Sequence, residues 1–527
     1  MEYLPDHLLI EIFEYLDAKN IKKVEKVSER WKQLIISSSR IMRKFTILSY
    51  EKRDDGLSFD DNLSKPEDRR QQIIEQFDKL EDEMKQHSYR NIVIMFSDAS
   101  LIPSEKYLDI VENCFTRIEK IKIMDPDNYL MMKTLSFISS TLSELKFDPL
   151  NDDNFDDFEP ILLPKLKVCE IKKSTKILKY IRAPNLKTLI LKNCKNDDEN
   201  LENFLKKTKK LKKLEFEAEF SLDLISTAFS LEYLEITDIK SPNFMALFKS
   251  FIIPHQNTLK VLKITQRNSD CKEILAFVIE NLRLETLDCC GRLDVHQNTE
   301  ILDIMSENTS IKNLYIAFNA YNRNSIVHLD HMDMELKIIK KCTKIKNLKI
   351  DYLNGKFENF LKQIQGSDFK TFVIGFGNSV ESTDIKYDKL DVLTVKRIAF
   401  ETEIRSLVNF TAAFPNLKKL TFERLTIQNY ADYFHQMFKT CRNLEEIEIK
   451  RLSGTTEDLY ESLKSDDCHL KLLKIQVSKI SEARKIEEIF KNSSFNVQIF
   501  SISDQKRVEW DKFVNSYDLC IYDDDDF

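Results

Sequence analysis

A six-residue pattern of apolar positions recurs along most of the chain. It consists of an apolar residue, two mostly polar residues, a second apolar residue, one further residue and a third apolar residue, as in LKTLIL from Leu186. The pattern starts at Ile118, Leu142, Leu166, Leu186, Leu211, Leu231, Leu259, Leu284, Ile311, Ile345, Phe369, Leu390, Leu417, Leu444, Leu470 and Val497. Successive starts lie about 25 residues apart on average, which is a period typical of stacked strand-containing repeats.

The last three positions of each pattern predict a short strand, because alternate side chains of a strand point to the same face. One such strand cannot bury its apolar face alone, whereas stacked units share one core. Most of the intervening stretches carry apolar residues three and four apart, which predicts helices. The clearest predicted helices cover residues 197–210, 273–283, 299–310, 357–365 and 431–443.

The first 44 residues have a different, helical pattern. Pro5 and Asp6 suit the first turn of a helix, and Ser28 suits the cap of a later one. Three short helices are expected, and their apolar positions include Leu8, Leu9, Ile12, Phe13, Leu16, Ile21, Val24, Trp31, Leu34 and Ile35. About 40 residues are too few to bury such broad stripes, so part of this surface should meet the rest of the chain or another protein.

This segment resembles the F-box motif. The resemblance rests on the Leu4-Pro5 opening, the apolar positions just described and the ending Val27-Ser28-x-Arg30-Trp31. It implies binding to the Skp-type adaptor of a cullin–RING ubiquitin ligase, with Trp31 and its neighbours bracing the module. The adaptor-binding residues that it implies are Leu4, Pro5, Leu8, Leu9, Ile12, Leu16, Ile21 and Trp31.

Three positions depart from the F-box pattern. Lys22, Glu25 and Lys26 stand where the family usually has small or apolar residues, which weakens the expected adaptor binding.

The repeats resemble leucine-rich-repeat solenoids, especially those fused behind an F-box. The expected fold class is therefore α/β: a three-helix F-box followed by an irregular leucine-rich-repeat solenoid, with parallel strands on the concave face and helices on the convex face. Only Cys194 and Asn319 supply the Cys or Asn of the repeat consensus, whereas Leu353, Leu425 and Leu452 replace it elsewhere. Uneven curvature is expected.

Four segments follow from these patterns. They are an F-box-like domain at 1–44, a transition with the first irregular repeats at 45–117, the solenoid at 118–505, and a cap with an acidic tail at 506–527. The transition contains strand candidates FTILSY from Phe45 and NIVIMF from Asn91, and a helix at about 66–88.

Charge and composition limit the partners and the location that are expected for this protein. The formal charge is −7, so nucleic acid is not expected as a partner. No signal peptide and no membrane-length apolar run is visible, and the ten scattered cysteines suit a reducing compartment, so a cytoplasmic or nuclear location is expected. The basic run KKTKKLKK from Lys206 is interpreted as a solvated helix end, and its alternative role is binding of nucleic acid or a phosphoinositide headgroup.

Candidate chemistry is sparse. Seven glycines and no Gly-rich loop speak against a phosphate cradle, and the pair His328 and His331 lacks further metal ligands at suitable spacing. No catalytic, metal-binding or cofactor-binding residue is predicted, and an enzyme is not expected.

The sequence therefore predicts a substrate-recognition subunit of a Skp–cullin–F-box ubiquitin ligase, whose repeats bind an unknown protein substrate. A ligase-independent binding scaffold is the alternative. Specificity would come from exposed strand-face positions such as Lys187, Thr188, Glu232, Tyr233, Lys260, Val261, Lys418 and Lys419.

Overall fold

A computed structural model describes most of the chain. The described residues are 4–16, 21, 23–42, 46–49, 74–75, 77–82, 84–85, 89–95, 104–124, 128–149, 158–195, 198–217, 229–237, 244–270, 272–292, 305–318, 336–353, 357–376, 383–398, 404–423, 430–451, 456–463, 468–477, 480–491 and 493–501. They divide into two compact units. Unit 1 holds the described residues up to 231 together with 244–251, and unit 2 holds 232–237 and 252–501.

The N-terminal part of unit 1 is helical. Helices α1 (Asp6–Tyr15), α3 (Glu29–Ser37) and α4 (Ser39–Met42) are joined by a segment in which Ile21, Lys23 and Val24 are also helical. Ser28 caps α3 as expected, since its side chain accepts a hydrogen bond from the backbone N–H of Trp31 at 3.2 Å. The three-helix F-box arrangement stays a prediction.

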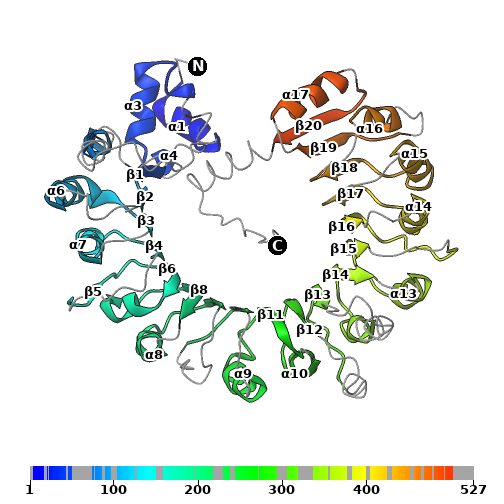
Figure 1. Ribbon diagram of the computed structural model, residues 1–527, viewed down its shortest axis with the longest axis horizontal. Coiled ribbons are helices and arrows are strands. Elements are labelled where there is room, and N and C mark those ends of the chain that lie inside the picture. The colour runs from blue at the N-terminus through cyan, green and yellow to red at the C-terminus, as the bar shows by residue number, and fades with distance from the viewer. Residues whose placement is uncertain are drawn as a thin grey trace, which may run out of the picture. The chain divides into compact units, whose positions relative to one another are not determined.

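The rest of unit 1 is a parallel sheet with helices on its outer side (Figure 1). The strands pair in chain order: β1 (Thr46–Ser49), β2 (Asn91–Met95), β3 (Lys120–Met124), β4 (Glu144–Asp148), β6 (Val168–Ser174), β8 (Thr188–Lys195) and β9 (Lys213–Glu217). Helices and 3-10 turns follow the strands: α6 (Ser104–Cys114), η2 (Phe115–Arg117), α7 (Asn128–Ile138), η3 (Lys176–Tyr180) and α8 (Asp198–Lys207). Helix α9 (Phe244–Ile252) begins in this unit.

Unit 2 repeats the same plan. Its strands also pair in parallel and in chain order: β10 (Tyr233–Thr237), β11 (Val261–Asp270), β12 (Thr286–Arg292), β13 (Asn313–Phe318), β14 (Asn347–Leu353), β15 (Thr371–Phe376), β16 (Val392–Ile398), β17 (Lys419–Phe422), β18 (Glu446–Ile449), β19 (Leu472–Val477) and β20 (Asn496–Ser501). On the outer side lie η5 (Ile253–His255), α10 (Lys272–Asn281), α13 (Phe357–Ile364), α14 (Ile404–Ala412), α15 (Tyr430–Thr440), α16 (Thr456–Leu463) and α17 (Ile480–Ile489) (Figure 1).

The recurring apolar positions form the core between strands and helices. In the pattern that starts at Ile311, for example, Ile311, Leu314 and Ile316 are each 0% exposed. Every pattern from Ile118 to Leu470 is buried in the same way. Equivalent positions stand beside one another across the sheet, since Leu314 pairs with Leu287 on one side and Leu348 on the other. The prediction of parallel strands that share one apolar face is confirmed.

Phenylalanine fills much of the space between sheet and helices in unit 2. Phe357 of α13 lies 4.9 Å, between ring centroids, from Phe410 of α14, and Phe360 lies 5.4 Å from Phe372 of β15. A Phe ring buries a large apolar area and, unlike Tyr or Trp, requires no hydrogen-bond partner. Many of the phenylalanines in the sequence therefore serve to fill this interior.

Two successive repeats contain a short extra strand. Between the strands β4 and β8, short strands β5 (Ile161–Leu162) and β7 (Ile181–Arg182) form a separate two-stranded parallel sheet. The segments ILLP and IRAP repeat after 20 residues, and the proline in each removes a backbone donor and disfavours helix at the residue before it. The apolar pattern of the sequence does not predict these two short strands.

Most other predicted features fall where expected or lie beyond the described residues. Helices stand at four of the five clearest predicted stretches, as α8, α10, α13 and α15, and the described positions between 74 and 85 are helical. Asn319, residues 299–304 and the acidic tail lie outside the described residues. The helix predicted at 299–310 is wrong for its described half, because residues 305–310 are not helical and Asn308 forms a parallel bridge with Cys342. The four predicted domain segments stay predictions.

Shortening a core side chain should destabilise unit 2 far more than removing a surface charge beside it. We expect Leu314→Ala to lower the free energy of unfolding by about 2–5 kcal/mol, because the cavity cannot close. The matched variant Lys312→Ala removes a side chain that is 53% exposed and should change stability by about 0.5 kcal/mol or less. Urea unfolding followed by circular dichroism measures both, and equal losses would contradict the assigned core.

Candidate functional site

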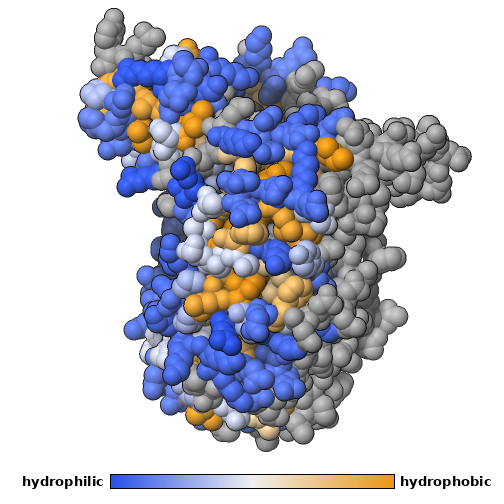
Figure 2. Space-filling view, turned by 90° about the vertical axis from the view of Figure 1, so that its left-hand side faces the viewer, coloured by the Kyte–Doolittle hydropathy of each residue, from blue (hydrophilic) through white to orange (hydrophobic). Residues whose placement is uncertain are grey.

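Helix α1 has an inner and an outer apolar face. Leu9 and Phe13 are 0% and 1% exposed, whereas Leu8 and Ile12 are each 38% exposed and Tyr15 is 91% exposed. Leu8, Ile12 and Tyr15 follow one another at intervals of four and three residues, so they lie along one side of the helix. We call these three residues the α1 stripe. Figure 2 shows hydrophobic atoms among the hydrophilic surface of the N-terminal helices, at the top of the view.

The inner face of α1 belongs to a small core. Phe13 lies 5.3 Å from Trp31 between ring centroids. The buried members of this core are Leu9, Phe13, Ile21, Trp31, Ile35, Ile41 and Met42. Tyr89, two residues before β2, packs against the same cluster. Part of the apolar surface of the N-terminal helices is therefore covered by the rest of the chain, which is one of the two options that the sequence left open.

Arg30 fixes the start of α1 against α3. Its guanidinium donates hydrogen bonds to Asp6 Oδ1 at 2.6 and 3.1 Å and to the backbone oxygen of Leu4 at 2.7 Å. The two charged side chains are 43% and 60% exposed, so their ion pair contributes little free energy. Its effect is geometric, because it holds the Leu4-Pro5 turn at one end of the α1 stripe.

The eight predicted adaptor-binding residues fall into three groups. Pro5, Leu8 and Ile12 are exposed, and Leu4 and Leu16 are half-buried. Leu9, Ile21 and Trp31 are buried in the core of the module, where they support the exposed residues from beneath. Direct contact of these residues with an adaptor stays a prediction.

Two further exposed apolar residues were missed. Tyr15 continues the line of Leu8 and Ile12, and Val27 is 61% exposed. The signal for Tyr15 was its spacing, since it stands seven residues after Leu8. For Val27 the motif itself was the signal, although no contact role was assigned to it.

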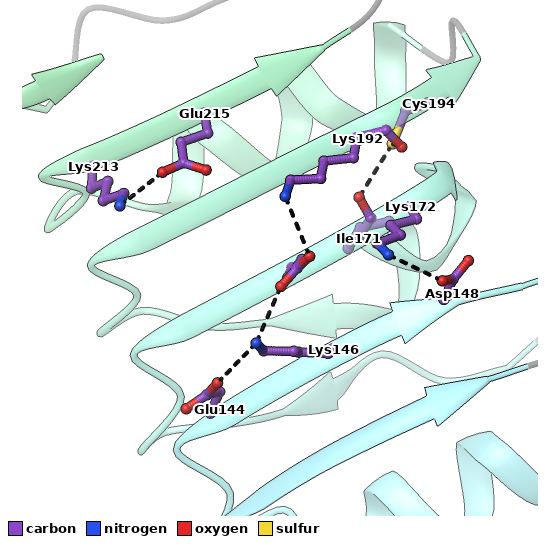
Figure 3. A network of polar contacts seen from close by, with 10 residues as sticks. Glu144, Lys146, Asp148, Ile171, Lys172, Lys192, Cys194, Lys213 and Glu215 are labelled. Atoms are coloured by element: carbon purple, nitrogen blue, oxygen red, sulfur yellow. Dashed lines mark hydrogen bonds and ion pairs between the residues drawn. The ribbon is translucent and has the colours of Figure 1, made fainter. Parts of the chain in front are cut away.

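The inner face of the unit 1 sheet carries a network of ion pairs (Figure 3). Lys146 bridges Glu144 at 3.7 Å and Glu170 at 3.4 Å, and Glu170 is shared with Lys192 at 3.9 Å. These residues stand on the neighbouring strands β4, β6 and β8 and alternate along them with core positions. Glu170 is only 2% exposed, so long charged side chains cover one another on this face.

The most perturbed lysine in this network is Lys122 on β3. Its pKa is lowered to about 8, chiefly by burial and secondly by the neighbouring charge of Lys172. Asp148 and Glu170 oppose the shift. The folded chain therefore holds an ammonium group at neutral pH in surroundings that disfavour its charge.

In unit 2 the inner face combines ion pairs with an amide ladder. The side chain of Asn347 donates to Asn313 Oδ1 at 2.6 Å, and Asn313 donates to Thr286 Oγ1 at 2.9 Å. Further along, Lys419 pairs with Glu446 at 2.8 Å and Glu448 at 3.2 Å. Polar side chains at equivalent strand positions thus hold one another in fixed orientations.

The predicted specificity positions lie among these contacts. Lys260 pairs with Glu232 at 3.9 Å, and the ammonium of Lys263 lies 5.5 Å from the ring centroid of Tyr233. Lys418 pairs with Asp391 at 3.0 Å. Thr188 and Val261 are half-buried and Lys187 is exposed. Their contact with a substrate stays a prediction.

The basic run from Lys206 is divided between two surfaces. Lys206 lies in the last turn of α8 and pairs with Glu202 at 2.5 Å, whereas Lys213 lies on β9 and pairs with Glu215 at 2.7 Å. The run therefore does not form one continuous basic patch.

The described part of the chain offers little for covalent chemistry. Burial raises the pKa of Cys169 and Cys342 to about 12 and that of Cys441 to about 11, so these thiols stay protonated at neutral pH. Among the described residues no group of three or more His, Cys, Asp or Glu is arranged to hold a metal ion. None of the described helices combines the length and the apolar character that crossing a membrane requires. His328 and His331 lie outside the described residues.

Comparison with known proteins identifies the N-terminal module. The F-box-like family model matches residues 1–48, the segment that contains α1, α3 and α4. The resemblance of this segment to the F-box is thereby supported, while the leucine-rich-repeat character of the following repeats stays a prediction. A comparison with curated proteins found no match.

Replacing Lys122 by an uncharged side chain should stabilise the protein at neutral pH. A pKa of about 8 in the folded chain lies below the ordinary value of 10.5, so the folded state binds this proton less tightly than the unfolded state. The penalty is absent above pH 10.5, grows as the pH falls towards about 8, and is complete at pH 7, where it reaches roughly 3 kcal/mol at most. We expect Lys122→Met to raise the free energy of unfolding at pH 7 by about 1–3 kcal/mol.

Urea unfolding at pH 7 and again near pH 10 tests this expectation, since the advantage of Lys122→Met should shrink at the higher pH. Lys120→Met, on the same strand but 36% exposed, is the matched control and should change stability little. A Lys122→Met protein less stable than the original at pH 7 would show that contacts of the ammonium outweigh its burial.

Proposed function

We propose that this protein is a substrate-recognition subunit of a Skp–cullin–F-box ubiquitin ligase. The observation that carries the proposal is the F-box-like match at residues 1–48, which coincides with the exposed α1 stripe. F-box domains typically bind Skp-type adaptors. The long parallel-stranded repeats would then hold the protein to be modified.

The α1 stripe has the form of a helix that docks into an apolar groove. Leu8 and Ile12 each retain 38% exposure although the neighbouring Leu9 and Phe13 are fully covered. Complete burial of a leucine or isoleucine side chain contributes about 1.5–3 kcal/mol, so covering the part that each residue still exposes contributes roughly 0.6–1 kcal/mol per residue. This is a share of the about 8 kcal/mol that micromolar binding requires.

The mechanism would be proximity. Binding of the adaptor and of a substrate by one chain raises the effective concentration of a substrate lysine near the ubiquitin-carrying enzyme. The chain itself would make or break no bond and would require no cofactor. Its work would be done in the cytoplasm or the nucleus, without nucleic acid or membrane as a partner.

A ligase-independent binding scaffold is the second candidate. It is favoured by the charged residues Lys22, Glu25 and Lys26, which replace small or apolar residues of the F-box pattern. If these positions lie at the adaptor interface, their desolvation costs free energy that the usual residues do not. The repeats would then bind a protein partner for another purpose.

Binding of the purified full-length chain to a Skp-type adaptor, measured by calorimetry, decides between the two. We expect micromolar or tighter binding by the original chain. Leu8→Asp with Ile12→Asp should weaken it about 100-fold or more, because two apolar contacts are lost and two charges are buried.

Gln33→Asp with Ser37→Asp is the matched control, since it places two acidic side chains four residues apart on exposed positions of α3. We expect this variant to bind as the original does, and circular dichroism shows whether both variants stay folded. Absence of binding by the original chain at micromolar concentration would leave the scaffold as the better account.

A further inference from the structure

The inner face of unit 1 carries more lysines than carboxylates. Among the described side chains of β3, β4, β6 and β8, the lysines are Lys120, Lys122, Lys146, Lys172, Lys173 and Lys192, and the acidic residues are Glu144, Asp148 and Glu170. We call the six lysines the lysine face. The surplus of three positive charges is confined to four neighbouring strands, because β9 adds Lys213 but also Glu215 and Glu217.

Each of the three carboxylates is already shared. Glu144 pairs with Lys120 at 2.9 Å and with Lys146 at 3.7 Å. Asp148 lies 3.3 Å from the ammonium groups of both Lys172 and Lys173. Glu170 divides in the same way between Lys146 and Lys192. The internal carboxylates therefore cannot neutralise the lysine face.

The register places like charges directly beside each other. Lys122 stands opposite Lys146 on the next strand, and Lys172 stands opposite Lys192. Neighbouring strands are only about 4.8 Å apart, and like charges in such pairs are destabilising. Burial is the main cause of the lowered pKa of Lys122, and the neighbouring charges of Lys172 and Lys146 act in the same direction.

Unit 2 shows that the fold does not require such crowding. There Lys419 pairs with Glu446 and Glu448, and Lys474 pairs with Glu446, so two lysines meet two carboxylates on β17, β18 and β19. Ion pairs on an inner face can thus be balanced within the sheet. A lysine surplus maintained at a cost in stability is typical of a binding surface.

We propose that the lysine face binds a peptide segment with clustered negative charge, either acidic side chains or phosphorylated residues. This inference rests on the proposed function, since it names the class of substrate segment that the repeats would hold. The four strands span roughly 14 Å, which an extended peptide covers with about four residues. Lys120, Lys172, Lys173 and Lys192 are accessible, with side-chain exposures of 36%, 29%, 47% and 28%.

A peptide fits this surface better than nucleic acid does. The three carboxylates lie among the lysines and would repel a continuous phosphate backbone, and the chain as a whole carries a formal charge of −7. A short acidic segment places its charges between the lysines without following a long basic track. It also relieves the repulsion within the pairs Lys122–Lys146 and Lys172–Lys192.

Fluorescence anisotropy with the full-length chain tests the proposal. The probes are three labelled octapeptides of otherwise equal sequence, containing consecutive glutamates, phosphoserines or glutamines. We expect the glutamate or the phosphoserine peptide to bind and the glutamine peptide to bind at least about tenfold more weakly, with affinity falling as salt is raised. The tighter of the two charged peptides identifies the source of the charge.

Two matched double variants locate the site. Lys172→Gln with Lys192→Gln should weaken binding of the charged peptide about tenfold or more. Lys419→Gln with Lys474→Gln, whose side chains are equally exposed at 30% and 28% on the inner face of unit 2, should leave it within about twofold. Thermal unfolding shows whether both variants are folded.

The proposal is overturned if neither charged peptide binds, if the glutamine peptide binds equally well, or if the two double variants lose equal affinity. Labelled oligouridylate is the nucleic-acid probe. If it binds more tightly than the peptides and the Lys172–Lys192 variant abolishes its binding, the proposal is also overturned. Calorimetry with the adaptor on the same preparations separates this inference from the proposed function. Peptide binding without adaptor binding supports the lysine face and rejects the ligase role, and the reverse result rejects only the lysine face.

Discussion

The fold depends on sharing an apolar core among strands too short to bury their own faces. Each repeat offers a leading apolar residue and two strand positions, and these reach full burial only against the equivalent residues of the next repeat, as Leu287, Leu314 and Leu348 do. Helices and phenylalanine rings close the outer side of this core. In the two connections between β4 and β8, which contain Pro164 and Pro184, the short strands β5 and β7 pair with each other.

This shared core leaves the inner face free to vary. Side chains that alternate with the buried positions stand at fixed spacing from their neighbours on adjacent strands, so charge and hydrogen bonding extend across the sheet in rows. Unit 2 uses the rows for a ladder of Thr286, Asn313 and Asn347 and for balanced ion pairs. In unit 1 the rows bring lysines side by side and share each carboxylate between two of them. The same backbone plan thus presents two chemically different faces.

The N-terminal module differs from the repeats, because its small core leaves apolar residues exposed on its surface. Phe13 and Trp31 form the centre of that core, Tyr89 extends it, and Arg30 holds the Leu4-Pro5 turn in place. The α1 stripe lies outside all of these contacts. An exposed line of apolar side chains on an otherwise well-packed helix is typical of a surface that meets a partner.

The sequence alone determined the strands, their apolar face and the boundaries of several helices. The reason is that apolar periodicity is a local property: the spacing in LKTLIL or LEYLEI allows only one face to be buried. The F-box-like character of the first residues was also readable, because many ordered positions match within a short segment. The same local signals did not separate Leu8 from Leu9 or Ile12 from Phe13, since neighbouring apolar residues on a helix differ only in which side the tertiary contacts cover.

Only the tertiary structure decided those assignments, and it also decided the chemistry of the inner face. Strand register brings Lys122 beside Lys146 and Lys172 beside Lys192, although these residues are 20 or more positions apart in the chain. Burial of Glu170 and the crowding around Lys122 arise from side chains of four strands together. Such properties depend on distances between repeats, whose lengths vary, so no periodicity within a single repeat contains them.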